Sequence, residues 1–234
     1  MIITGRVKTT MIEKWQKAQA LEAEHWLKSI GSGNGDDVAL SEEKASPGYE
    51  EVSAKIMRRL GFNQDDFAGK VLLDIGAGPT SRIAWLNADL KIAIDPLYDA
   101  YKGIGWAQLG AYDVWHSSPA EEQLPLAQFV DGVFCINCLD HCYEPQKVIA
   151  NASAYCRDGA AFALSVDIGE ESDDMHPSAG LMLPATITQW LSDCDFSVLR
   201  FDLGQSYPTP EGGWLDGWGG DMAAHWVCAR RFRD

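Results

Sequence analysis

The hydrophobic residues of this chain follow two different periodicities, and the periodicity changes near residue 70. Residues 11–30, "MIEKWQKAQALEAEHWLKSI", have the periodicity of one helix. Residues 47–61, "PGYEEVSAKIMRRLG", are typical of a second helix, with Pro near the start and Gly at the end. Between the two, "GSGNGDD" breaks the first helix and begins a polar link. We therefore expect an N-terminal helical extension or lid over residues 1–69.

After residue 70, short β-branched or aliphatic runs alternate with helical stretches such as "EPQKVIANASAYC". The runs are "VLLDIG" (71–76), "KIAID" (91–95), "YDVWHS" (112–117), "VDGVFCIN" (130–137), "AAFALSVD" (160–167), "FSVLRFDL" (196–203) and "AHWVCARR" (224–231). This alternation predicts right-handed βαβ units. No helical pattern separates the last two runs, so the final strand should pair antiparallel.

The predicted fold class is therefore α/β. We expect a doubly wound, mostly parallel seven-stranded sheet with a final antiparallel strand and helices on both faces, formed by residues 70–234. In such a sheet, ligands bind outside the carboxyl ends of the strands. The residues that follow each strand are thus the first place to look for chemistry.

The first helix carries an unusual stripe of side chains. Residues eleven apart share a helix face, and Trp15 and Trp26 are such a pair, with Gln19 and Glu22 between them on the same side. One interpretation is a docking face whose polar groups are satisfied locally, and the other is a lid over a ligand. The Gly-, Pro- and Trp-rich stretch at 204–222 leaves similar alternatives, since it could pack against the body or form an aromatic wall.

Charge and hydropathy narrow the function classes. With 19 basic and 34 acidic residues the net charge is −15, which disfavours a nucleic-acid partner. No run approaches the roughly 18 apolar residues of a membrane span, and the first residues lack a signal-peptide core. We expect a cytoplasmic protein without a membrane partner.

The six cysteines invite a metal or disulfide interpretation. "CINCLDHC" holds Cys135, Cys138, His141 and Cys142, which resembles half of a zinc site, but no second CxxC or HxxxH pair completes it. Cys135 and Cys138 also lie in a β-like run, where positions three apart face opposite ways. We expect buried, reduced thiols and no metal ion.

The stretch "VLLDIGAGPT" at 71–80 combines a strand, an acid and two glycines. Gly76 and Gly78 let the backbone turn tightly and approach a ligand. The next strand ends at Asp95, whose carboxylate could accept hydrogen bonds from both hydroxyls of a ribose. A dinucleotide loop would need a third glycine, which is absent here. Asp74 would repel a pyrophosphate but suits a cationic amino group, which favours a nucleoside without phosphates.

At this point the chain resembles the class I S-adenosylmethionine-dependent methyltransferases, over about residues 70–231. The resemblance rests on four motifs in family order. They are "LLDIGAGPTS", "IAIDP", "SSPAEEQLP" (similar to the family's AE-x-LP adenine segment) and "FVDGVFCINCLDHCYEPQKVIANASAYCRDGAAFALSV". The resemblance implies S-adenosylmethionine as cofactor and S-adenosylhomocysteine as its product.

The resemblance also implies roles for individual residues. Gly76 and Gly78 would face the methionine part and the ribose. Asp74 would help to hold the amino group, and Asp95, followed by Pro96, would bind the ribose hydroxyls.

Three further cofactor contacts follow from the later motifs. Ala120 and Glu121 would lie by the adenine, although "AEEQLP" has one residue more than the family spacing and the register could slip by one. Asn137, at the end of the fourth strand, would offer its backbone to the methionine end.

Acceptor chemistry is expected just past the fourth and fifth strands. An oxygen acceptor must lose a proton, and His titrates near neutrality. "NCLDHCYEP" contains His141 and "DIGEESDDMHPSAG" contains His176, so these two are our candidate catalytic residues. The acids of the second loop, with Asp140 or Asp167, could instead hold a divalent metal, but acid-rich loops are usually only solvated.

The expected function is transfer of a methyl group to a small-molecule or glycan acceptor, at oxygen. The "LDH…EP" block followed by "HP" resembles methyltransferases associated with sugar or cell-surface glycan modification. One alternative is a non-catalytic S-adenosylmethionine-binding interaction subunit. Another is a nicotinamide-dependent oxidoreductase, which the missing third glycine and Asp74 disfavour. A homo-oligomer remains open.

Overall fold

The computed structural model describes residues 10–31, 53–79, 81–104, 107–169, 171–205 and 222–232. Its α-helices are α1 (Met11–Gly31), α3 (Tyr98–Ile104), α4 (Pro145–Tyr155) and α5 (Pro184–Asp193). Residues 53–59 are also helical. The 3-10 turns are η1 (Ala107–Ala111), η2 (Leu139–His141) and η3 (Ala179–Leu181). The strands are β1 (Val71–Ile75), β2 (Leu90–Ile94), β3 (Val114–His116), β4 (Val130–Ile136), β5 (Cys156–Ile168), β6 (Phe196–Gln205) and β7 (Met222–Arg230).

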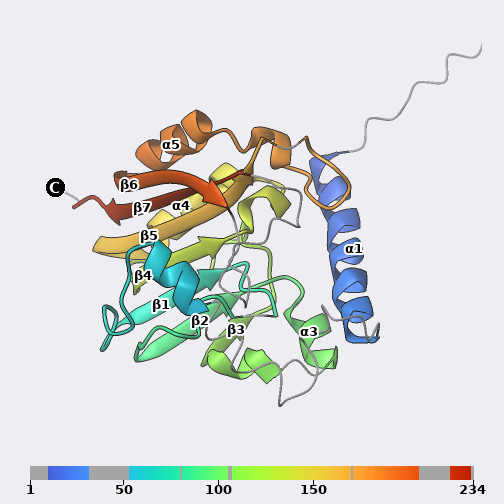
Figure 1. Cartoon of the computed structure of the whole chain (residues 1–234), viewed down its shortest axis with the longest axis horizontal. Coiled ribbons are helices and arrows are strands. Elements are labelled where there is room, and N and C mark those ends of the chain that lie inside the picture. The colour runs from blue at the N-terminus through green and yellow to red at the C-terminus, as the bar shows by residue number, and fades with distance from the viewer. Residues whose placement is uncertain are drawn as a thin grey trace, which may run out of the picture.

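The seven strands form one sheet in the order β3-β2-β1-β4-β5-β7-β6 (Figure 1). The pairs β2–β3, β1–β2, β1–β4 and β4–β5 are parallel. β7 is antiparallel to both of its neighbours, β5 and β6. The predicted mostly parallel sheet with an antiparallel final strand is confirmed, and that strand is inserted between β5 and β6.

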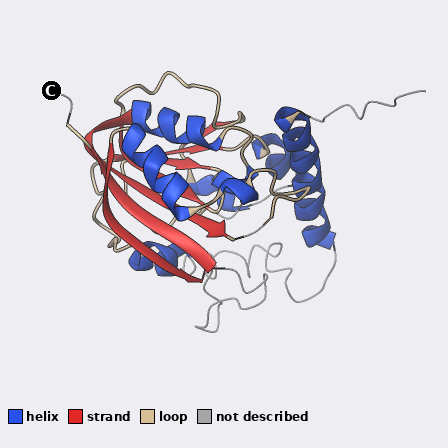
Figure 2. Ribbon diagram, turned by 90° about the horizontal axis from the view of Figure 1, so that it is seen from above, coloured by secondary structure: helices blue, strands red, loops and turns tan. Residues whose placement is uncertain are grey.

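Helices cover both faces of the sheet, as predicted (Figure 2). On one face, α4 and α5 bury Val148, Ile149, Ile187 and Leu191 against inward-facing strand residues such as Val133. On the other, the segment 53–59 and the residues after β1 bury an equivalent set, which includes Ile56, Met57, Ile83 and Leu86. Successive residues of β4 alternate between the two clusters, because side chains of a strand alternate in direction.

Helix α1 covers neither face of the sheet and lies beside α3, across the ends of the strands (Figure 1). It begins one residue after Thr10, whose hydroxyl accepts a hydrogen bond from the Glu13 N–H (3.3 Å) while the Glu13 carboxylate accepts one from the Thr10 N–H (2.6 Å). This reciprocal pair is a capping box, which fixes where the helix starts. None of the described helices is long and apolar enough to cross a membrane.

Some expected features lie partly or wholly outside the described residues. The second predicted helix is seen only over 53–59, and its first half falls outside the description, as do the link after α1 and the Trp-rich stretch over 206–221. The expectation that Cys138 belongs to a β-like run was wrong, since β4 ends at Ile136. Asn137 then takes a positive φ of 53° and redirects the chain into η2.

Candidate functional site

A pocket lies at the carboxyl ends of β1, β2 and β4 and is closed on one side by α1. Its cavity volume is about 120 Å³, within about 770 Å³ of empty space that includes open solvent. Twelve of its lining residues were named from the sequence as site or lid candidates. They are Trp15, Gln19, Glu22, Trp26, Gly76, Gly78, Asp95, Pro96, Ala120, Glu121, Asn137 and His141.

The loop after β1 and the end of β2 are joined by hydrogen bonds to one buried carboxylate. Asp95 accepts from the Gly78 N–H through Oδ2 (2.9 Å) and from the Leu97 N–H through Oδ1 (2.8 Å). Gly78 has a φ of +57°, and a Cβ there would meet no atom within 4 Å, so the backbone faces open space. An ionised carboxylate has about four acceptor positions, which leaves about two for ligand hydroxyls. Burial raises the pKa of Asp95 to about 7.

Asp74 lies beneath this loop and does not line the pocket. Its Oδ2 accepts a short hydrogen bond from the hydroxyl of Tyr112, and its Oδ1 is buried without a hydrogen-bond partner among the described residues. Burial raises the pKa of Asp74 to about 7, against the lowering effects of Tyr112 and the Arg82 charge. Any contact between Asp74 and a ligand would thus be made from below the pocket floor.

The segment of Ala120 and Glu121, which the sequence predicts to contact adenine, is anchored to α4 and the loop before it. The Glu121 carboxylate accepts from the backbone N–H groups of Tyr143 (2.7 Å) and Glu144 (3.2 Å), and the Ala120 carbonyl accepts from the Asn151 side chain (2.9 Å). Both residues line the pocket. The Glu121 side chain therefore has a structural task that sequence reasoning did not foresee.

Asn137 also lines the pocket, at the turn after β4. Its N–H donates to the Ser165 carbonyl (2.8 Å), so only its carbonyl and side chain are available to a ligand. The side-chain Oδ1 is buried and has no hydrogen-bond partner among the described residues. An unpaired buried acceptor at a pocket wall is a candidate to receive a donor from a bound molecule.

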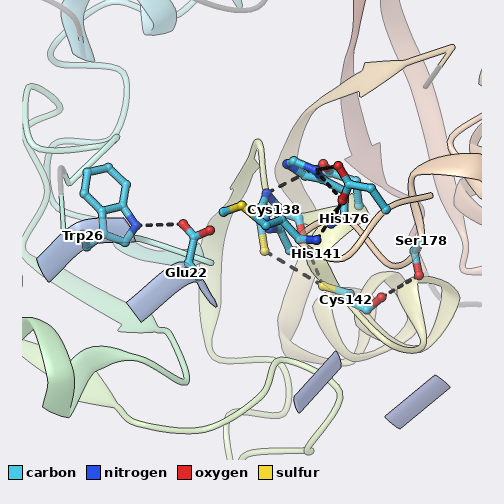
Figure 3. Close-up of polar contacts among 10 residues, drawn as sticks. Glu22, Trp26, Cys138, His141, Cys142, His176 and Ser178 are labelled. Carbon is cyan, nitrogen blue, oxygen red and sulfur yellow. Dashed lines mark hydrogen bonds and ion pairs between the residues drawn. The ribbon is translucent and has the colours of Figure 1, made fainter. Parts of the chain in front are cut away.

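All four side chains of the α1 stripe line the pocket. The Trp26 indole donates to Glu22 Oε1 (2.7 Å) and holds that carboxylate in place (Figure 3). Trp15 packs edge-on against Tyr143, with ring centroids 5.1 Å apart. The Gln19 Oε1 is buried without a hydrogen-bond partner among the described residues. The stripe thus lines the pocket and also packs through Trp15, and its action as a lid stays a prediction.

The rings of the two candidate catalytic histidines are in contact. His141 in η2 and His176 after β5 have ring centroids 4.5 Å apart (Figure 3), but only His141 lines the pocket. Burial lowers the pKa of His141, yet the nearby carboxylates of Asp140 and Glu22 more than offset it, so the pKa lies above its ordinary value. The pair stands beside the Asn137 end of the pocket.

Three thiols lie under the same wall, which the sequence prediction of opposite-facing cysteines missed. Cys138 lines the pocket and its sulfur lies 4.0 Å from that of Cys142. Hydrogen bonds from Cys135 and Cys142 lower the pKa of the Cys138 thiol. The six cysteines are all unbridged. A turn at Asn137, rather than a strand, brings these sulfurs together.

The pocket suits S-adenosylmethionine in three ways. Asp95 has acceptor positions left for ribose hydroxyls, and the Gly78 backbone faces open space. The residues that line the pocket include three carboxylates, those of Glu22, Asp95 and Glu121, and one guanidinium, that of Arg82. This excess of acidic groups suits a cationic ligand better than a phosphate. The residues present therefore fit this cofactor.

No protein-family model and no curated protein matches the sequence. Solved structures do match in fold. The [4+2]-cyclase SpnF has a TM-score of 0.61 and 14% identity, covering 97% of this chain and 98% of its own. A Burkholderia thailandensis 1,6-didemethyltoxoflavin-N1-methyltransferase with bound S-adenosylhomocysteine has a TM-score of 0.57 and 16% identity, covering 98% and 94%.

A third match is magnesium protoporphyrin IX methyltransferase from Synechocystis with bound SAM, with a TM-score of 0.59 and 16% identity over 97% of this chain and 100% of that one. At such identities the likeness is one of fold. The chain has the class I S-adenosylmethionine-dependent methyltransferase fold, as its motifs predicted. That SpnF is a cyclase means that the fold alone does not fix the reaction.

Proposed function

We propose that this protein is an S-adenosylmethionine-dependent methyltransferase. The observation that carries the proposal is the hydrogen-bonded link between Asp95 and the Gly78 N–H, because it builds a nucleoside site at the junction of β1 and β2. Asp95 would bind the ribose hydroxyls, and Ala120 and Glu121 would flank the adenine. Asn137 and the Gly76 backbone would hold the methionine end, with Asp74 acting from beneath.

When bound, the cofactor supplies an electrophilic sulfonium methyl group. The residues of this chain would align an acceptor with that methyl, and such positioning contributes on the order of 7 kcal/mol or more in well-oriented models. The bond from the acceptor to the methyl carbon would form as the bond from that carbon to sulfur breaks, the electron pair would stay on S-adenosylhomocysteine, and the hydroxyl proton of the acceptor would pass to His141 or to water. His141, which lines the pocket, would contact the acceptor atom, and His176 would act from beside it, with the two ring centroids 4.5 Å apart.

The acceptor that we propose is a small molecule or a glycan, methylated at oxygen. The pocket supports this through Trp15, Trp26 and Tyr101, whose rings line it and could stack on a flat molecule or a sugar ring. The strongly acidic chain argues against nucleic acid.

The first experiment is isothermal titration with S-adenosylhomocysteine and, in parallel, with NAD. We expect binding of the first alone. Binding of NAD alone would overturn the assignment in favour of a nicotinamide-dependent oxidoreductase, which Asp74 below the loop disfavours. A screen of hydroxylated small molecules and oligosaccharides then follows, with release of S-adenosylhomocysteine as the readout.

A second candidate is a protein that binds S-adenosylmethionine without transferring its methyl group. The fold similarity to a cyclase supports this second candidate, because it shows that the fold is not confined to methyl transfer. Retained cofactor binding without turnover of any acceptor in the screen would favour this alternative. Loss of turnover in His141→Ala at unchanged S-adenosylhomocysteine affinity would exclude it.

A further inference from the structure

Three side chains that are common metal ligands converge beside the pocket. Asp140 and His141 come from η2 after β4, and His176 comes from the loop after β5. One ligand atom of each lies within 4.8 Å of those of the other two. Two imidazoles and one carboxylate form a ligand set that suits zinc and other first-row transition ions.

One oxygen of the carboxylate in this group has no hydrogen-bond partner among the described residues, and the other is within ion-pair distance of His141. Asp140 is 2% exposed, and its Oδ1 is buried with no hydrogen-bond partner among the described residues. Its Oδ2 lies 3.7 Å from His141 Nε2, which is beyond hydrogen-bond distance. A buried carboxylate is costly unless a donor or a cation satisfies it. Asp140 therefore points to a cation between itself and the histidines.

The ring of His176 is held by the carboxylate of Asp173. Its Nδ1 lies 3.1 and 3.2 Å from the two carboxylate oxygens of Asp173, while Asp173 Oδ1 also accepts the N–H of His176 (2.6 Å). With the proton assigned to Nδ1 by this contact, the lone pair of Nε2 is left free. A carboxylate behind a histidine is the usual support of a metal-binding imidazole.

The two loops are fastened to each other by one buried residue. The Ser178 N–H donates to the Asp140 carbonyl (3.0 Å), and its hydroxyl donates to the Cys142 carbonyl (2.6 Å) (Figure 3). Ser178 is fully buried. Both contacts hold the His176 loop against η2, so the three ligands belong to one rigid unit rather than to two independent loops.

We propose that Asp140, His141 and His176 bind a divalent transition-metal ion of the zinc type, with Asp173 orienting His176. Two ligands placed about 2.0–2.1 Å from zinc lie about 3.3 Å apart at a tetrahedral angle. The 3.7 Å between Asp140 Oδ2 and His141 Nε2 is close to this value, and the ligand atoms, which all lie within 4.8 Å of one another, would move together by up to about 1.5 Å on binding. The proposal goes against our sequence-based expectation of no metal ion.

The ion would serve the same site as the proposed methyl transfer, and this part of the inference rests on that function. Three protein ligands leave coordination positions open. Since His141 lines the pocket, an open position there would take an oxygen of the acceptor and hold it toward the methyl group. The acceptor class is therefore a molecule with a hydroxyl that can bind a metal ion. On this view His141 and His176 contact the acceptor through the ion.

The test is titration of the chelator-treated full-length protein with Zn²⁺ alone, in the absence of S-adenosylmethionine. We expect one site. His176→Ala should lose it, and Asp173→Ala should weaken it about 10- to 100-fold. His116→Ala, at the end of β3, is the matched control and should bind as the wild type does. Circular dichroism of each variant establishes that it is folded.

The thiols require a separate control, because Cys138 and Cys142 also lie nearby. Cys138→Ser should keep the site, and the Co²⁺-loaded protein should lack a sulfur-to-cobalt charge-transfer band. Zinc binding that survives His176→Ala but is lost in Cys138→Ser would overturn the proposal. So would the absence of any stoichiometric site in the folded wild-type protein.

The zinc titration and the S-adenosylhomocysteine titration test the metal site and the proposed function independently. Metal binding without S-adenosylhomocysteine binding would contradict the methyltransferase and keep the metal site. Binding of S-adenosylhomocysteine without binding of Zn²⁺ would contradict the metal site and keep the proposed methyltransferase.

Discussion

A Cβ added to Gly76 would lie 2.1 Å from the Sγ and 2.4 Å from the Cβ of Cys138. The loop after β1 and the turn after β4 thus touch at the pocket floor, with no room for a methyl group. Since Gly76 also has a φ of +65°, two independent reasons require glycine there.

Gly76→Ala should therefore disrupt the cofactor pocket, with S-adenosylhomocysteine affinity reduced at least 100-fold in titration calorimetry. Gly69→Ala is the matched control, because Gly69 also has a positive φ (+77°) and no atom within 4 Å of the new Cβ, but it does not line the pocket. It should show only the smaller cost of backbone strain, on the order of 1 kcal/mol. Adding Cys138→Gly to Gly76→Ala should restore part of the affinity, and adding Cys138→Ala should not. Equal affinities of the two single variants would contradict the steric argument.

Asp95 should make cofactor binding depend on pH. The pKa of its carboxyl is raised to about 7 by burial, and the ribose hydroxyls need the ionised form as acceptor. The affinity for S-adenosylhomocysteine should therefore increase as pH rises from about 5.5 through 7 and then level off. The titratable groups that act on this carboxyl are Glu22, Cys138, Asp74, Tyr101 and His141.

Titration calorimetry of Asp95→Ala checks this directly. We expect affinity to fall on the order of 100-fold near pH 8, since hydrogen bonds to a charged group each contribute about 1.5–3 kcal/mol. The remaining pH dependence should be shallower than in the wild type. Asp99→Ala, at an exposed position of α3, should behave as the wild type. An unchanged affinity of Asp95→Ala would remove the ribose role.

Asp74 should make the stability of the ligand-free protein fall with rising pH. Its folded pKa of about 7 lies above its ordinary value of 3.8, so the folded state retains a proton that the unfolded state has lost. Between about pH 4 and 7 this costs stability as pH increases, and below 4 the effect is absent. Asp74→Asn should increase the free energy of unfolding relative to the wild type, and the increase should be larger at pH 8 than at pH 5. Urea unfolding of both proteins at both pH values measures this. A variant whose stability difference from wild type is the same at both pH values would exclude an ionisable Asp74.

Tyr112→Phe tests the other half of this buried pair. The change removes the hydroxyl that donates to Asp74 Oδ2 and leaves both carboxylate oxygens without a partner. We expect a loss of about 1–3 kcal/mol in the free energy of unfolding. The loss should be larger at pH 8 than at pH 5, because the ionised carboxylate needs the donor more. A variant as stable as the wild type at pH 8 would contradict the contact.

Helix α1 should control how fast the cofactor leaves. Trp26 lines the pocket and Leu27, the next residue, is 58% exposed. Trp26→Ala should raise the dissociation rate of S-adenosylhomocysteine in stopped-flow fluorescence, and Leu27→Ala should leave it unchanged. Deletion of residues 1–30 should raise the rate further. If the truncated chain releases the ligand no faster, the Trp residues serve packing alone.

The sequence predicted those parts of the site that depend on local order along the chain. Gly76, Gly78 and Asp95 could be found because strands β1 and β2 are adjacent and parallel, so that their carboxyl ends must meet. The contact of His141 with His176 depends on the hydrogen bonds of Ser178, and the partner of Asp74 comes from Tyr112, 38 residues away. Such contacts join distant segments with no pattern in the sequence, which is why they were not predicted.

The placement of α1 across the strand ends has a consequence for synthesis. The Lys17 ammonium pairs with Asp174 (2.5 Å), 157 residues later in the chain, and Trp15 packs on Tyr143. A chain made from its N-terminus at about 5–20 residues per second exposes α1 well before either partner exists. The α1 wall of the pocket is thus translated before the segments that it contacts, and a nascent chain cannot enclose ligand until the loop after β5 has emerged.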